Sequence, residues 1–154
     1  MEIIENKIEV SARALEGYQT AVIYKKPVYA GEPKKQVATV IITHHFGFLP
    51  VVQEGNIYKK DNIWNVGVYI FKNSSAFKKL KKANDMYDAE TILGFNFYKG
   101  ATLFERNKES FRIEDDYNHI EDDYYEGCSK EFPSGIVEEA KALEEYVISL
   151  GVDK

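Results

Sequence analysis

The chain has 154 residues, of which 44% are hydrophobic and 29% are charged. This is the length of one domain, which we expect to span residues 1–154, and the composition excludes a disordered or a membrane-spanning chain. The first residues, MEIIENKIEV, lack the basic region and the apolar run of a signal peptide, and the chain has a single cysteine, Cys128. These features predict a cytoplasmic protein.

Strand patterns dominate the first third of the chain. Residues 7–14 alternate between apolar and polar side chains, and residues 18–29 follow a Glu16–Gly17 turn as a returning strand. Residues 36–44 carry β-branched side chains on both faces, which is typical of a central strand. Pro27 is tolerated best at a sheet edge or a strand end.

The next stretch predicts a break and a further strand. We expect residues 46–50 to interrupt the regular pairing, and residues 61–62, Asp-Asn, to form a turn. Residues 63–71 then predict a strand with an apolar face. That face consists of Trp64, Val66, Val68 and Ile70.

The second half contains two predicted helices and a predicted hairpin. Possible N-cap residues at 73–75 favour a short helix over residues 76–84, and residues 91–98 and 101–105 read as the two strands of a hairpin. Residues 111–113 are a weaker strand candidate. A C-terminal helix begins near Ser134 and ends before Gly151. Its apolar stripe consists of Ile136, Ala140, Leu143, Val147 and Leu150.

These elements together predict an α+β fold. We expect a mostly antiparallel sheet of six to eight strands, with a barrel or a strongly curved sheet as open alternatives. One short internal helix and one C-terminal amphipathic helix complete the prediction.

The net charge of −5 is distributed unevenly along the chain. Residues 113–126 contain seven acidic side chains and no Lys or Arg, which leaves about +2 on the remainder. The pentapeptide Ile-Glu-Asp-Asp-Tyr occurs twice in this segment, at 113–117 and at 120–124. In a helix, the Ile and Tyr residues of both copies would form one apolar stripe. Because Asp disfavours helix interiors and adjacent like charges repel, an extended or looped segment is equally open.

Three interpretations of this acidic repeat remain open. It can be a solvated surface, a loose site for calcium or magnesium, or a docking surface for a basic partner. Carboxylates next to tyrosine rings favour the docking surface, since tyrosine is frequent in protein interfaces. The docking residues would be Glu114, Asp115, Asp116, Tyr117, Glu121, Asp122, Asp123 and Tyr124.

The leading hypothesis is therefore a non-enzymatic protein that binds a macromolecule through the acidic repeat. An inhibitor, an immunity-type protein or a nucleic-acid mimic would fit this pattern. The expected partner is a basic protein or a nucleic-acid-binding protein, with no direct nucleic-acid binding, no membrane, no metal and no cofactor.

The alternative hypothesis is a small-molecule or cofactor-binding domain that uses His44 and His45, with an enzyme as an open variant of this alternative. Adjacent residues of a strand point to opposite faces, so both imidazoles cannot bind one metal ion unless the strand ends there. An imidazole paired with a carboxylate can act as a general base.

A resemblance supports this alternative. The order VATVIIT at 37–43, PVV at 50–52 and NVGVYIFKNSSAFKKLKKAN at 65–84 gives a strand pair followed by a short helix. Over about a third of the chain this order loosely resembles flavin-binding split barrels. The resemblance implies a pocket for a small molecule.

Overall fold

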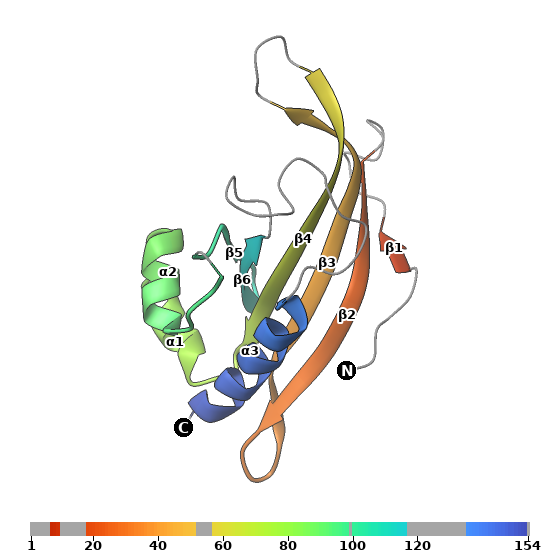
Figure 1. Cartoon of the computed structure of the whole chain (residues 1–154). Helices are drawn as coiled ribbons and strands as arrows, with labels where there is room; N and C mark the ends of the chain where they lie inside the picture. The colour runs from red at the N-terminus through yellow and green to blue at the C-terminus, as the bar shows by residue number, and fades with distance from the viewer. Residues whose placement is uncertain (1–6, 10–17, 52–56, 99, 117–134, 154) are drawn as a thin grey trace.

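The computed structural model describes residues 7–9, 18–51, 57–98, 100–116 and 135–153. It contains one antiparallel β-sheet and three helices, so the α+β class is confirmed (Figure 1). The strands are β1 (Lys7–Glu9), β2 (Tyr18–Ala30), β3 (Lys35–Val51), β4 (Ile57–Phe71), β5 (Leu103–Arg106) and β6 (Ser110–Asp116). The helices are α1 (Ala76–Leu80), α2 (Met86–Leu93) and α3 (Ile136–Leu150).

The sheet is open, with the strand order β1-β2-β3-β4-β6-β5. The barrel alternative is therefore wrong. The expected number of six to eight strands is not matched exactly. Five strands of four or more residues form the sheet, and β1 adds a three-residue segment along β2.

Strands β3 and β4 form a long hairpin that corrects the sequence prediction. Their pairing runs without a shift from Ala38 opposite Ile70 to Val51 opposite Ile57. The expected break at 46–50 and the expected turn at 61–62 are therefore wrong, because the continuous ladder outweighs the local turn signals. In the described part of the chain, Pro50 lies beyond the last β3 residue that pairs with β2. This side of β3 is therefore an edge at position 50, and proline is tolerated at a sheet edge.

The chain between β4 and β5 contains two helices, and the predicted hairpin strand at 91–98 is not formed, whereas the predicted strand at 101–105 overlaps β5. Helix α1 ends at Leu80, earlier than expected, and α2 occupies part of the segment predicted as strand 91–98. The Asp85 side chain accepts a hydrogen bond from the backbone N–H of Asp88 and caps the start of α2. Gly94, with φ of +79°, ends the helix in the left-handed conformation that glycine adopts readily.

Helix α3 packs across β2, β3 and β4, as predicted for the C-terminal helix (Figure 1). Four residues of its predicted stripe are fully buried, and Leu150 is partly buried. The fully buried residues are Ile136, Ala140, Leu143 and Val147. They pack against Val40 and Ile42 of β3 and against the predicted apolar face of β4. In the described part of the chain, no helix has the length and apolar character that crossing a membrane requires.

Candidate functional site

Strand β3 divides its side chains between the two faces of the sheet. Val40 and Ile42 lie on the face that the helices cover, which we call the helix face, and His44 stacks there on Trp64 with ring centroids 4.0 Å apart. Thr39, Ile41, Thr43 and His45 lie on the other face, which we call the cavity face. The strand runs on to Val51, so the two neighbouring imidazoles stay on opposite faces.

The cavity face is hollowed by a cavity of about 590 Å³. Strands β2, β3, β4 and β6 all contribute side chains to it, and this combination of apolar walls and convergent polar groups is typical of small-molecule sites. The lining residues are Thr20, Val22, Lys25, Gln36, Thr39, Ile41, Thr43, His45, Tyr69, Phe71 and Arg112.

Hydrogen bonds within β3, and one between β2 and β3, fix polar side chains that line the cavity. The His45 ring contacts the Thr20 hydroxyl through Nδ1 at 2.8 Å and the Thr43 hydroxyl through Nε2 at 3.4 Å. The Gln36 amide donates to the Thr39 hydroxyl at 3.1 Å. These bonds hold the polar groups in place before any ligand arrives.

An ion pair lies at the β6 side of the cavity. Arg112 Nη2 is 2.8 Å from Glu114 Oε1, and the guanidinium lies 5.4 Å from the centroid of the Tyr69 ring. Burial raises the pKa of Glu114, and the Arg112 charge offsets part of that rise. Since the Glu114 side chain is only 2% exposed, water screens this pair poorly.

Gly67 makes room for this ion pair. It lies directly opposite Glu114 in the β4–β6 ladder, and a Cβ at position 67 would be 2.2 Å from Glu114 Cγ. The glycine therefore lets the carboxylate lie flat against the sheet beside the guanidinium. A glycine inside a strand often marks such a close approach.

The first copy of the acidic repeat belongs to β6 and is turned inward. Glu114 and Asp115 are buried, and Asp116 is half-buried, so the first two carboxylates do not lie on an exposed surface. The helical stripe through this copy is not formed, because β6 pairs with β4 up to Asp116. The remaining predicted docking residues, Tyr117, Glu121, Asp122, Asp123 and Tyr124, lie outside the described residues.

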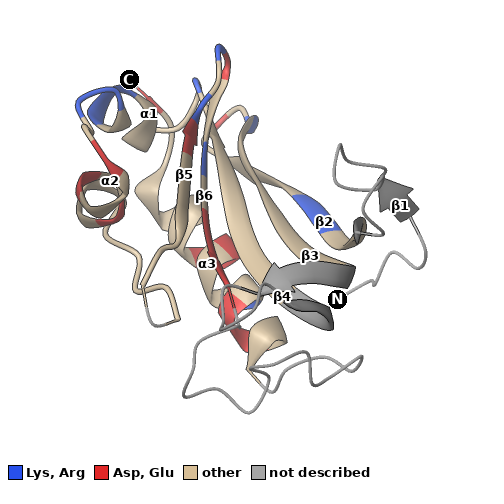
Figure 2. Cartoon of the chain, turned by 90° about the horizontal axis from the view of Figure 1, so that it is seen from above, with Lys and Arg blue, Asp and Glu red and all other residues tan. Residues whose placement is uncertain are grey.

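Asp115 lies on the helix face, next to Glu139 of α3. Figure 2 shows acidic positions on β6 and α3 close to each other. Burial, followed by the hydrogen bond and the charge of Glu139, raises the pKa of Asp115 far above its usual range. The nearby backbone amides of Val66 and Tyr98 offset only part of that rise. Asp115 therefore binds its proton more tightly than an exposed carboxyl group does.

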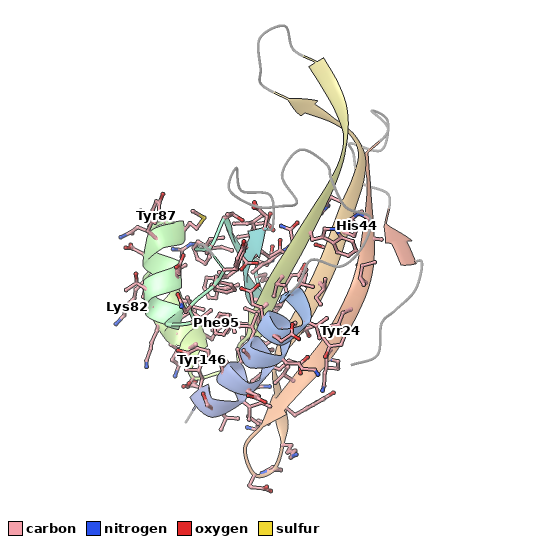
Figure 3. The ribbon with its side chains drawn as sticks, viewed as in Figure 1. Tyr24, His44, Lys82, Tyr87, Phe95 and Tyr146 are labelled. Carbon is pink, nitrogen blue, oxygen red and sulfur yellow. The ribbon has the colours of Figure 1, made fainter. Side chains whose placement is uncertain are left out.

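A second cavity, of about 560 Å³, lies between α3 and residues 95–98. Phe95 and Tyr146 face each other next to it, with ring centroids 5.5 Å apart (Figure 3). Of its lining carboxylates, Glu139 already accepts the backbone N–H of Tyr98 at 2.7 Å. The first cavity, on the cavity face, has more kinds of polar side chain in its lining than this second cavity. It is therefore the better candidate site.

Several residues of this site were missed at the level of sequence. Arg112, Tyr69 and Gly67 were not proposed as site residues, because their meeting with β3 depends on the pairing of strands far apart in the chain. Two signals were present. The glycine interrupts a strongly apolar strand, and Thr39 and Thr43 lie on the same face of the predicted strand as His45.

Comparison with known proteins adds no family. No protein-family model matches the chain, and no curated protein or solved structure matches it either.

Proposed function

We propose that this protein binds a small organic molecule in the cavity on the cavity face of its sheet. The observation that carries the proposal is the cavity of about 590 Å³, which lies within the range of about 300–1,000 Å³ of ligand sites. Its size and its mixed lining support the small-molecule hypothesis over docking through the acidic repeat. The inward position of Glu114 and Asp115 weighs in the same direction.

The proposal gives the two histidines different roles. His45 lines the cavity and would contact the ligand, together with the hydroxyl groups of Thr20 and Thr43. His44 lies on the helix face against Trp64, where its role is packing. Of these two histidines, it is therefore His45 that would contact the ligand.

A fluorescent probe tests the proposal. N-phenyl-1-naphthylamine is uncharged, brightens on entering an apolar site and fits the volume of the cavity. We expect saturable binding to the native chain and at least a tenfold loss in the Thr43→Trp variant, whose indole would project into the cavity and obstruct it. Thr91→Trp, on an exposed position of α2, is the matched control and should bind like the native chain.

Equal binding by both tryptophan variants would contradict the proposal, provided that circular dichroism shows both to be folded. So would the absence of binding by the native chain for this probe and for its sulfonated analogue, 8-anilinonaphthalene-1-sulfonate.

A further inference from the structure

The charges around the cavity indicate which ligands it takes. Two cationic side chains, Lys25 and Arg112, line it from opposite walls, and no carboxylate is among its lining residues in the described part of the chain. Lys25 is exposed and forms no ion pair with another described residue. Glu114 is not among the lining residues and is already paired with the guanidinium of Arg112.

Arg112 still has a donor to offer. Its Nη2 binds Glu114 at 2.8 Å, and its Nη1 is 3.8 Å from Glu105. Its Nε–H is buried and has no hydrogen-bond partner among the residues that the structure describes. A buried donor without an acceptor is unfavourable, so a small shift of the guanidinium that brought this N–H to a ligand acceptor would be favoured. Arg112 itself is among the lining residues of the cavity. Guanidinium groups recognise carboxylate and phosphate oxygens particularly well, because their donors match the spacing of these oxygens.

The remaining lining is suited to an apolar body. Val22, Ile41 and Phe71 contribute hydrocarbon surface, and the Tyr69 ring lies beneath the guanidinium. A ligand with its acid group at Arg112 would therefore place its apolar part over Ile41, in the middle of the sheet. Lys25, across β3 on β2, adds a second positive charge from the opposite wall.

We infer that the ligand is an amphipathic organic anion, with a carboxylate or phosphate group bound by Arg112 and attracted by Lys25. This inference rests on the proposed function, because it names the ligand class of the same cavity. It leads to a direct comparison of charged and uncharged molecules that share one ring system.

The first experiment compares 8-anilinonaphthalene-1-sulfonate with N-phenyl-1-naphthylamine, which has the same skeleton without the sulfonate. We expect the anion to bind the native chain about tenfold more tightly or better, as one charge-assisted hydrogen bond allows. Competition against the anionic probe then separates the acid groups. 1-Naphthoate and 1-naphthyl phosphate should both displace the anionic probe, whereas the uncharged 1-naphthylmethanol should displace it about tenfold less well. Whichever of the two anions competes more strongly shows whether the site prefers a carboxylate or a phosphate.

Substitutions test whether Lys25 and Arg112 cause the preference for the anionic probe. Lys25→Gln should reduce the preference for the anion several-fold, whereas Lys26→Gln, one residue away and on the helix face beside Glu144, should change it by less than about twofold. Arg112→Gln alone would leave a buried carboxylate unpaired and could unfold the chain. The double variant Arg112→Gln with Glu114→Gln removes both charges together and should abolish most of the preference.

The outcomes separate this inference from the proposed function. If both probes bind equally, and Thr43→Trp blocks both, the cavity binds small molecules and the inference is wrong. An anion preference that survives both Lys25→Gln and the double variant would also overturn it. If Thr43→Trp blocks neither probe, the proposed function itself fails.

Discussion

Gly67→Ala should disrupt the ion pair between Arg112 and Glu114 at the side of the cavity. The added Cβ would lie 2.2 Å from Glu114 Cγ and 2.8 Å from its Oε1, so the carboxylate has to move or β6 has to shift. Both atoms belong to a side chain that is 2% exposed, with little space for an alternative position.

The expected loss follows from three contributions. A hydrogen bond to a charged group contributes about 1.5–3 kcal/mol, and overpacking a buried site costs about 1–3 kcal/mol. Alanine recovers about 0.5–1 kcal/mol relative to glycine within a strand. We therefore expect Gly67→Ala to lower the free energy of unfolding by about 2–5 kcal/mol.

Urea denaturation followed by circular dichroism measures this loss, and a double-mutant cycle assigns it. In a Glu114→Ala background the added Cβ no longer meets the carboxylate, so Gly67→Ala should cost less than about 0.5 kcal/mol. An equal loss in both backgrounds would refute the reasoning, because the cost would then arise from the backbone and not from the displaced carboxylate.

Other predictions concern the helix face and the acidic repeat. Leu143→Ala should cost about 2–5 kcal/mol in the same denaturation assay, since this side chain is fully buried, and a loss below about 1 kcal/mol would contradict its place in the core. Asp115 binds its proton more tightly in the folded chain than in the unfolded chain. Its contribution to the free energy of unfolding should therefore be greatest below about pH 4 and should fall as the pH rises. Asp115→Asn, which resembles the protonated form, should flatten this fall between pH 5 and pH 9, and parallel curves for both proteins would be the contrary result. If the acidic repeat binds a basic partner, replacing Asp122 and Asp123 by Asn should slow association and reduce its salt dependence, and unchanged binding at low salt would argue against docking there.

The parts of the fold that were predictable depend on local periodicity. The stripe around Leu143 recurs at helical spacing over the whole of α3, and the alternation of β3 placed His44 and His45 on opposite faces. In both cases a single element decides the result, so its own sequence is sufficient.

The errors arose where two local signals competed. Residues 91–98 resemble a strand because of their aromatic side chains, but the cap at Asp85 and the glycine at 94 define a helix that ends at Leu93. The first copy of the acidic repeat fits a helical stripe and a strand equally well. Pairing with β4 decides for the strand, and this pairing cannot be read from residues 113–117 alone.

The candidate site was only partly predictable for a related reason. His45 was identified from its own neighbourhood, but the cavity also needs Tyr69 and Arg112, which reach it through the register of β4 and β6. In the sequence alone, Arg112 is an ordinary residue of the strand candidate 111–113, next to the acidic segment. Only its position beside Glu114 and above Tyr69 gives it a role in binding.

The most direct test of ligand binding on the cavity face is an NMR titration of the isotope-labelled chain with 1-naphthoate. We expect intermolecular nuclear Overhauser contacts between the naphthyl protons and the methyl groups of Val22 and Ile41, with amide shifts concentrated in β2, β3, β4 and β6. Contacts confined to α2 and α3, or no saturable shift at millimolar ligand, would contradict the account.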